Sequence, residues 1–339
     1  MTMLLEHGGC LQLAARQFGI PAADWLDLST GINPNGWPVP PVPAECWLRL
    51  PEEQDELLPA ARAYYGNSSL LAVAGSQAAI QTLPRLRPQS RVGVLHPAYA
   101  EHAGAWQRAG HQVTALQVHA LESALPALDV LILINPNNPT GCRWPIAQLS
   151  DWHGRLQQRG GWLIVDEAFI DTTPELSLSP LPVKPGLIVL RSLGKFFGLA
   201  GIRCGFVIAE TAILQRLAAE LGPWAISHPA RYAAARALKD TQWQRETAIR
   251  LKLQSRRLTD LLSENGWPPS GGCDLFQWIE TEYAGQLHRI LAEQAILTRL
   301  FSRPASVRLG LPKDEPAWRR LQHALAHPGV LALQAVKSG

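Results

Sequence analysis

Short apolar runs alternate with helical patterns between about residues 57 and 235 of the chain. Such runs are typical of strands buried on both faces, as in a mostly parallel sheet. The predicted strands are 70–74, 91–95, 130–134, 162–165, 187–190 and 205–208. The helices that support this interpretation are 76–85, 99–109 and 145–159. Together they predict a doubly wound α/β domain, which binds its ligands beyond the carboxyl ends of its strands.

The two ends of the chain have a different pattern. Five prolines fall within residues 31–43, a stretch that predicts an ordered loop because proline disrupts helices and central strands. After about residue 235 the pattern predicts a smaller α+β unit, with helices near 240–265, 283–295 and 316–327 and strands near 275–279 and 306–309. We therefore expect an N-terminal arm over 1–44 that joins the small domain, a large domain over 45–235 and a small domain over 236–339.

Composition and charge narrow the class of protein. The 339 residues are 47% hydrophobic and 17% charged, and the mean hydropathy of −0.03 is that of a soluble globular enzyme. No apolar run approaches the roughly 18–20 residues that span a bilayer, so we expect no secretory signal and no membrane partner. The net charge of +3 is too small to indicate binding of nucleic acid.

The cysteines and histidines point away from a metal site. The five cysteines are scattered, odd in number and never arranged as C-x-x-C, which argues against disulfides and zinc and suits a reducing cytoplasm. Four histidines between strands are too irregularly spaced for metal binding and are interpreted as ordinary surface or core residues: His96, His102, His111 and His119. We predict no metal.

Two strand ends carry groups suited to holding a ligand. Residues 75–77 lie between a strand and a helix, where the free N–H groups suit a phosphate, although a plain helix cap is the simpler interpretation of Ser76. The turn at 135–141 follows the most apolar strand. Two prolines frame Asn138 in this turn and fix its amide where a ligand oxygen could be held.

Two further strand ends carry charged groups. Asp166 ends the strand 162–165, and a buried carboxylate is costly unless it has a partner such as a protonated ring nitrogen. Lys195 follows a strand, between glycines and among apolar side chains that favour the neutral, nucleophilic amine. Ser192 and Arg203 flank it with a hydroxyl and a fixed cation, which suit a phosphate. In this order the four motifs indicate one cofactor, pyridoxal 5′-phosphate.

These motifs resemble those of the fold-type I pyridoxal-phosphate superfamily, aminotransferase class I/II, over nearly the whole chain. The resemblance implies a large domain with a mostly parallel sheet and a smaller α+β domain. It implies that Lys195 binds the cofactor covalently, that Asp166 pairs with the pyridine nitrogen, and that Tyr99 stacks on the ring; these would be the catalytic residues. It also implies that Asn138 holds the ring oxygen. The phosphate would be held by Ser76, Gln77, Ser192 and Arg203.

Within the superfamily, the N-terminus is similar to that of the L-threonine-O-3-phosphate decarboxylases of cobalamin biosynthesis. The similarity lies in His-Gly-Gly at 7–9 and in the motif at 26–34. It implies substrate binding by His7, Gly8, Asn33, Asn138, Arg299 and Arg308. Of the two arginines, Arg308 would hold the α-carboxylate. Arg299 would grip the substrate phosphate, and a buried arginine between helix and strand explains it equally well.

The resemblance implies a carbon–carbon lyase that decarboxylates L-threonine O-3-phosphate to (R)-1-amino-2-propanol O-2-phosphate. Two alternatives stay open: an aminotransferase of the histidinol-phosphate type, and a non-catalytic scaffold in cobalamin assembly. The bond that breaks at the α carbon depends on geometry that the sequence does not show. The resemblance further implies a cytoplasmic homodimer with sites at the interface, which Tyr64 or Tyr65 would cross.

Three residues depart from the pattern of many relatives. Phe169 replaces a tyrosine, so that no hydroxyl is offered to the ring oxygen. Leu50 replaces the tyrosine that reaches the partner subunit's phosphate, and Gly194 replaces a hydroxyl residue before the lysine. The phosphate cup therefore has fewer donors, which leaves the affinity for the cofactor open.

Overall fold

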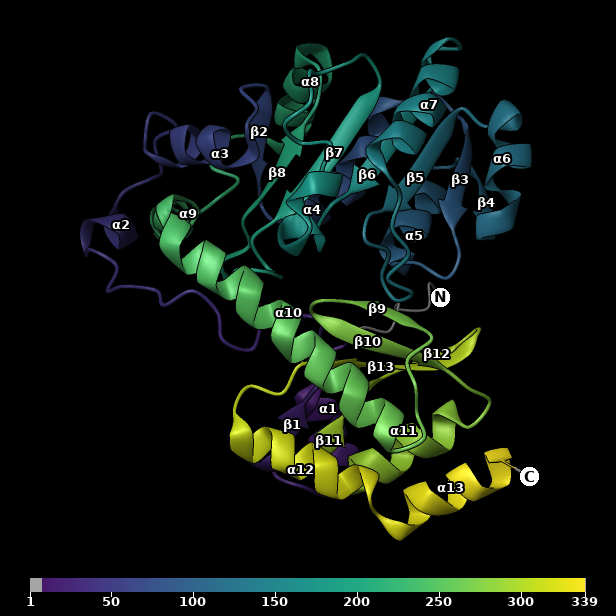
Figure 1. Cartoon of the computed structure of the whole chain (residues 1–339). Helices are drawn as coiled ribbons and strands as arrows, with labels where there is room; N and C mark the ends of the chain where they lie inside the picture. Colours follow the sequence, from purple (N-terminus) through teal and green to yellow (C-terminus); the bar gives the residue numbers. More distant parts are fainter. Residues whose placement is uncertain (1–7, 339) are drawn as a thin grey trace. The chain divides into compact units, whose positions relative to one another are not determined.

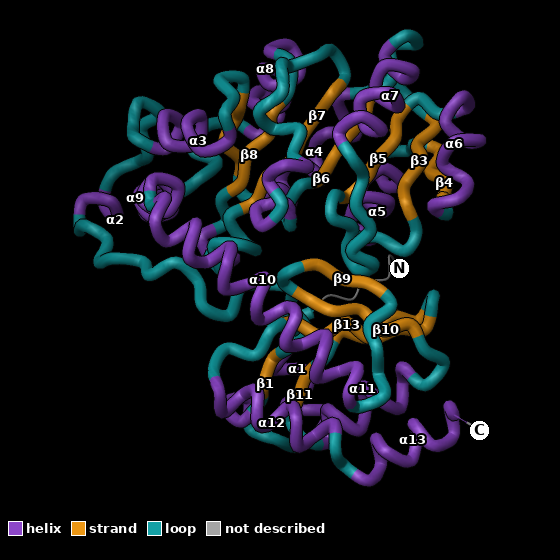
Figure 2. Tube along the Cα trace, viewed as in Figure 1, coloured by secondary structure: helices purple, strands orange, loops and turns teal. Residues whose placement is uncertain are grey.

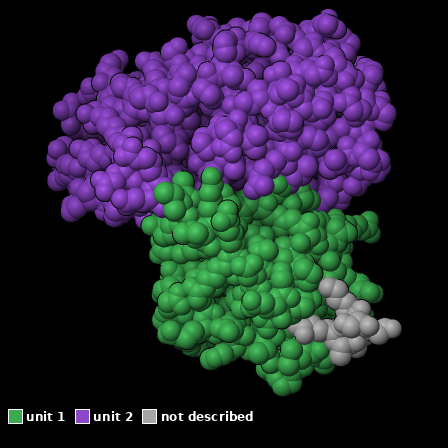
Figure 3. All heavy atoms as spheres, in the orientation of Figure 1, with its two compact units in different colours: residues 1–35, 139–141, 247–339 green, residues 36–138, 142–246 purple. Residues whose placement is uncertain are grey.

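The computed structural model describes residues 8–338, and the chain divides into two compact units (Figure 3). Unit 1 comprises residues 1–35, 139–141 and 247–339, and unit 2 comprises residues 36–138 and 142–246. The predicted boundaries after residues 44 and 235 stay predictions. Within residues 8–338, no helix has both the length and the apolar character needed to cross a bilayer.

Unit 2 is built around a seven-stranded sheet in the order β2-β8-β7-β6-β5-β3-β4 (Figures 1 and 2). Strand β8 runs antiparallel to both of its neighbours, and the other pairs are parallel, which confirms the predicted fold class. The strands are β2 (Leu70–Val73), β3 (Arg91–Leu95), β4 (Gln112–Leu116), β5 (Val130–Ile134), β6 (Trp162–Asp166), β7 (Leu187–Ser192) and β8 (Gly205–Ile208). The helices are α2 (Glu45–Leu48), α3 (Leu57–Tyr65), α4 (Ser76–Thr82), α5 (Ala100–Arg108), α6 (Leu121–Ala124), α7 (Ile146–Gln157), α8 (Thr211–Leu221) and α9 (His228–Lys239).

The central strands are buried on both faces, as their apolar runs predict. All five residues of β5 are at most 3% exposed, and each such side chain contributes about 1.5–3 kcal/mol by leaving water. Val130 and Ile132 pack with α4, α5 and α8 in one core cluster. Because side chains alternate along a strand, Leu131 and Leu133 face the other side of the sheet. The two helical layers therefore enclose the strands and leave their ends accessible.

Two elements of unit 2 differ from the prediction. Helix α4 ends at Thr82 and continues as a 3-10 turn over Leu83–Leu86, because Pro84 has no N–H to extend the α-helical ladder. Strand β4 was not predicted. It is the edge strand beside β3, and only Leu116 of its five residues is buried, so its sequence lacks an apolar run.

Unit 1 contains a four-stranded antiparallel sheet in the order β12-β13-β10-β9 and a parallel pair, β1 with β11. The strands are β1 (Leu26–Asp27), β9 (Gly271–Cys273), β10 (Phe276–Glu280), β11 (Ile296–Leu297), β12 (Arg299–Ser302) and β13 (Ala305–Gly310). The helices are α1 (Leu11–Phe18), α11 (Ala284–Glu293), α12 (Glu315–Leu325) and α13 (Pro328–Ser338). The boundary between the units falls within α10 (Thr241–Glu264), close to the predicted helix at 240–265.

Candidate active site

One cavity in unit 2 is lined by all eight residues that were predicted to hold a cofactor. These are Ser76, Gln77, Tyr99, Asn138, Asp166, Ser192, Lys195 and Arg203. Seven of them lie at or after the carboxyl ends of β2, β3, β5, β6 and β7. Arg203 instead precedes β8, whose antiparallel direction brings its start to the same edge of the sheet. The sheet topology therefore gathers residues from six segments around one cavity.

Asp166 is a buried carboxylate with a partner that the sequence pattern does not predict. It is 4% exposed, and its Oδ1 accepts a hydrogen bond from the Ala168 N–H at 3.0 Å. Its Oδ2 lies 3.0 Å from Nε2 of His102, which is 1% exposed. His102 is thus a core histidine, as interpreted, but its contact with Asp166 was not predicted. No pattern of residue types indicates this contact, because it depends on the packing of α5 against the sheet.

The loop before α4 passes close to the guanidinium of Arg203. Gly75 has a φ of 72°, and a Cβ atom at this position would lie 2.7 Å from Nη2 of Arg203. Arg203 itself has a φ of 50°, which is uncommon for a residue with a side chain, and its Nη1 donates to the Ala200 carbonyl at 3.1 Å. Gly75 is the N-cap of α4 and no side-chain cap bond is formed, so the cap interpretation of Ser76 was wrong. Ser76 is the first helical residue and faces the cavity.

Lys195 is half-buried in the loop after β7. Its Nζ lies 5.4 Å from the centre of the Phe169 ring, and both residues line the cavity. Phe196 and Phe197, which follow the lysine, are at most 2% exposed. On the other side of the lysine, the Gly194 N–H donates to Ser192 Oγ at 3.1 Å. The Lys195 side chain thus lies among apolar aromatic residues and follows the polar turn formed by Ser192 and Gly194.

A buried ionic cluster supports the segments that carry Asp166 and Ser192. Arg191 donates to Glu167 Oε2 at 3.0 Å and to Asp171 Oδ1 at 2.5 Å. Burial alone would lower the pKa of Arg191, but the carboxylates of Asp171 and Glu167 hold this pKa above its ordinary value. Tyr64 Oη donates to Asp171 at 2.8 Å, and the Tyr65 ring is buried under Arg191. Both tyrosines therefore make contacts inside unit 2, and the expectation that one of them crosses an interface stays a prediction.

The predicted substrate residues other than Asn138 belong to unit 1, where two arginines face each other. Arg308 on β13 and Arg299 on β12 are cross-strand partners, so their side chains share one face of the sheet. Burial, followed by Arg299, lowers the pKa of Arg308 to about 10. Burial and then Arg299 also lower the pKa of His288. The positive charges of Arg299 and Arg308 repel each other, and an anion bound beside them would relieve this repulsion.

Ser29 connects Arg308 to the N-terminal segment, although the sequence pattern does not predict this contact. Its carbonyl accepts from Arg308 Nη2 at 2.7 Å, and its Oγ accepts from the Gly9 N–H at 2.7 Å and donates to Asp27 Oδ1 at 2.6 Å. A Cβ on Gly8 would lie 2.4 Å from the same carbonyl. The structure thus brings Gly8 beside Arg308 through Ser29.

The remaining two substrate residues of the prediction are less closely tied to this cluster. Asn33 is 3% exposed, and its Oδ1 accepts from the Asn35 N–H at 3.0 Å, which closes a turn. His7 lies outside the described residues. Neither observation tests a role in substrate binding.

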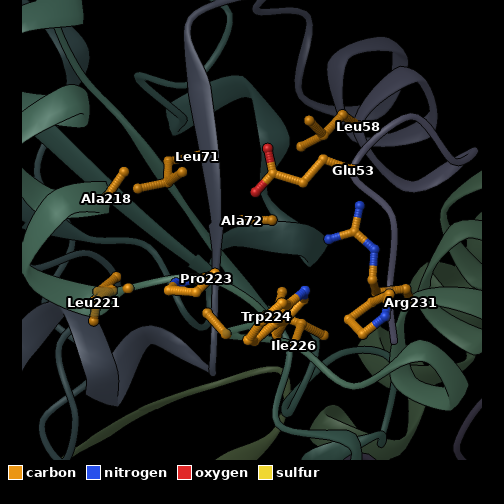
Figure 4. A pocket seen from close by; sticks show the side chains of 13 residues that line it. Glu53, Leu58, Leu71, Ala72, Ala218, Leu221, Pro223, Trp224, Ile226 and Arg231 are labelled. Atoms are coloured by element: carbon orange, nitrogen blue, oxygen red, sulfur yellow. The ribbon is translucent and has the colours of Figure 1, made fainter. Parts of the chain in front are cut away.

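Figure 4 shows a second cavity in unit 2, with Glu53, Trp224 and Arg231 among its labelled side chains. Arg231 donates to both oxygens of Asp55, at 2.6 and 2.7 Å, so its charge is already matched. None of the residues predicted for catalysis or cofactor binding lines this cavity. The chemistry that the sequence predicts therefore belongs to the first cavity.

Comparison with known proteins gives a family match over most of the chain. The model of the family "Aminotransferase class I and II" matches residues 50–325. The threonine-phosphate decarboxylase of Pseudomonas aeruginosa is 56% identical over 322 residues, 95% of this chain and 97% of that protein. The threonine-phosphate decarboxylase of a Sinorhizobium species is 41% identical, over 96% of this chain and 99% of that protein. The structure of histidinol-phosphate aminotransferase from Sinorhizobium meliloti in complex with pyridoxal-5′-phosphate shares the fold, with a TM-score of 0.83, 20% identity and coverage of 98% and 96%.

Proposed function

The chain belongs to the aminotransferase class I and II family of pyridoxal-phosphate-dependent enzymes, and we propose that it decarboxylates L-threonine O-3-phosphate. The products would be CO₂ and (R)-1-amino-2-propanol O-2-phosphate, for use in cobalamin biosynthesis. The observation that carries the proposal is 56% identity, across 95% of the chain, to a threonine-phosphate decarboxylase. The facing Arg299 and Arg308 support it, because this substrate carries two anionic groups.

The cavity of unit 2 fits pyridoxal 5′-phosphate. Asp166 offers a buried carboxylate that His102 orients, as a protonated pyridine nitrogen requires. Gly75 leaves open the space beside the Arg203 guanidinium that a Cβ would fill. The phosphate would be held by Ser76, Gln77, Ser192 and Arg203, the ring oxygen by Asn138 and the ring face by Tyr99. When bound, the cofactor supplies an electron sink for the negative charge left at the α carbon of the substrate.

The chain's own residues then position the substrate and move protons. Lys195 would supply the amine that holds the cofactor and the proton that replaces the lost carboxylate at the α carbon of the substrate. Arg308 would hold the α-carboxylate and Arg299 the phosphate, since a planar guanidinium matches both groups through paired hydrogen bonds. Gly8, Asn33 and His7 would complete the substrate site.

The reaction is tested by following the purified protein with two substrates. With pyridoxal 5′-phosphate and L-threonine O-3-phosphate, we expect release of one CO₂ for each (R)-1-amino-2-propanol O-2-phosphate formed. Conversion of the cofactor to pyridoxamine phosphate by histidinol phosphate, without CO₂ release from threonine phosphate, would instead establish an aminotransferase. Absence of any spectral change with either substrate would indicate a scaffold.

We also propose that the chain forms a homodimer in the cytoplasm. Leu48 is 84% exposed, Leu50 63% and Trp224 59%, and such apolar side chains mark an interaction surface when they gather. Pro51, directly after Leu50, lines the same cavity as Trp224. The five cysteines, all within the described residues, form no disulfide, which suits a reducing compartment.

Replacing Leu48 and Trp224 together by glutamate should produce a monomer. Sedimentation of the wild-type protein is expected to give twice the mass of one chain, and the double variant half of that, because two desolvated charges oppose association. Val118→Glu, at another exposed apolar position of unit 2, is the matched control and should remain dimeric. A wild-type protein that sediments as a monomer at micromolar concentration would contradict the proposal.

A further inference from the structure

Behind Tyr99 and Gln77 lies a carboxylate that does not line the cavity. Glu101, in the first turn of α5, accepts from Gln77 Nε2 at 3.1 Å, and the Tyr99 hydroxyl donates to Gln77 Oε1 at 3.2 Å. The three side chains thus form a relay from the cavity wall to Glu101. Its two ends come from α5 and the preceding residue, and its middle comes from the first turn of α4.

The relay has a fixed direction. An ionised carboxylate only accepts hydrogen bonds, so Glu101 requires the NH₂ group of Gln77 to face it. The amide oxygen must then face Tyr99, whose hydroxyl can only donate to it. Without the carboxylate, the Gln77 amide could turn over and the hydroxyl could exchange its roles. Glu101 therefore determines which way two groups at the cavity present their hydrogen-bonding atoms.

A second set of contacts holds Glu101 in place. Gln81, one turn after Gln77 on α4, donates to the same oxygen of Glu101 at 2.9 Å. Arg108 forms an ion pair with it at 3.6 Å and donates to Gln81 Oε1 at 2.8 Å. The Glu101 side chain is 13% exposed, whereas that of Arg108 is 45% exposed. The negative charge of Glu101 is thus kept close to the cavity wall.

The electrostatics at Tyr99 agree with this direction. The pKa of Tyr99 is raised to about 12, mainly by burial and further by the negative charges of Glu101 and Asp166. Arg203 opposes this change. The hydroxyl keeps its proton under ordinary conditions. A protonated hydroxyl is what donation to Gln77 requires.

We propose that Glu101 is a positioning residue, which acts through Gln77 to fix the Tyr99 hydroxyl and ring against the cofactor. The inference rests on the proposed cofactor site. It differs from a simple tie between α4 and α5, because a tie would act whether or not Tyr99 has a hydroxyl. Removal of that hydroxyl therefore separates the two explanations.

The test measures the dissociation constant of pyridoxal 5′-phosphate by titrating apoprotein and following tryptophan fluorescence. Glu101→Gln should raise this constant about tenfold, which corresponds to loss of one well-placed hydrogen bond. In a Tyr99→Phe background the same substitution should raise it less than about threefold. Glu101→Asp keeps the charge but shortens the side chain, and should weaken binding as Glu101→Gln does. Glu122→Gln is the matched control, since Glu122 also accepts from a glutamine and an arginine but lies away from the cavity, and wild-type affinity is expected.

Two results would overturn the inference. An equal loss of affinity from Glu101→Gln in both backgrounds would mean that Glu101 does not act through the Tyr99 hydroxyl, and that it acts as a tie between helices or on the phosphate through Gln77 alone. Wild-type affinity for Glu101→Gln or Glu101→Asp would mean that the relay has no role in cofactor binding. Thermal unfolding of each apoprotein shows whether the variants are folded. Failure of the wild-type protein to bind pyridoxal 5′-phosphate would contradict the cofactor site itself, which separates that outcome from failure of the relay.

Discussion

Replacing Lys195 by alanine is expected to abolish decarboxylation and the visible absorbance of the covalently bound cofactor. The half-buried Nζ faces the Phe169 ring in the cavity, where it would serve as both cofactor ligand and proton donor. Loss of proton transfer alone lowers rates by about 10²–10⁴-fold. Because the lysine lies in a loop after β7 and outside the apolar core, the fold should stay intact. Absorbance spectra, CO₂ release and circular dichroism measure the three effects.

Lys184→Ala is the matched control, because this lysine is exposed on the same unit and lies away from the cavity. It should keep both the absorbance and the activity. If the Lys195 variant retained the cofactor absorbance, another lysine would be the ligand. If the Lys195 variant lost the absorbance but kept the full rate, covalent attachment would not be required for the reaction.

The sequence predicts the residues of the cavity well because the central strands are buried on both faces. A run such as 130–134 has no polar position, so the first polar residues after it lie at the edge of the sheet. Parallel strands then bring these edges together, which is why Asn138, Asp166 and Lys195 line one cavity. The same logic fails for β4, whose exposed positions hide it from a search for apolar runs.

Side chains that act by supporting others carry no such signal. His102 contacts Asp166 only because α5 packs against the sheet, and its spacing relative to other histidines is uninformative. Ser29 has one bond to Arg308 and one to Gly9, residues that are 279 and 20 positions away in the chain. Glu101 is similarly joined to α4 through tertiary packing. Such roles depend on distances that a pattern of residue types does not contain.

Substitution of Arg308 should lower activity without lowering the stability of the fold. Burial disfavours the positive charge of Arg308, and a substrate anion would need that same charge for binding. Its pKa in the fold, about 10, is below that of an ordinary arginine, so at every pH below about 10 the cation is less favourable in the fold than in the unfolded chain. The difference is on the order of 3 kcal/mol, present at neutral pH and lost as the pH rises through 10 and above. Arg308→Gln should therefore leave the melting temperature of the apoprotein unchanged or raise it.

The same substitution is expected to lower kcat/KM for L-threonine O-3-phosphate severely. Removing one partner of a buried charge pair costs about 2–5 kcal/mol, or roughly 30- to 5,000-fold. Arg308→Lys should recover only part of the loss, since an ammonium lacks the planar fork of the guanidinium. Steady-state kinetics and thermal unfolding measured on the same preparations give both quantities.

Arg299 offers the matched comparison, because it lies opposite Arg308 on the same sheet but is proposed to hold the other anionic group. The product, (R)-1-amino-2-propanol O-2-phosphate, keeps the phosphate and has no carboxylate. Arg299→Gln should therefore weaken binding of the product, whereas Arg308→Gln should leave its dissociation constant within about twofold of wild type, because a single carboxylate contact is absent from that ligand. Equal weakening of product binding by both variants would contradict the division of roles, since it would mean that the two guanidiniums act on the phosphate together.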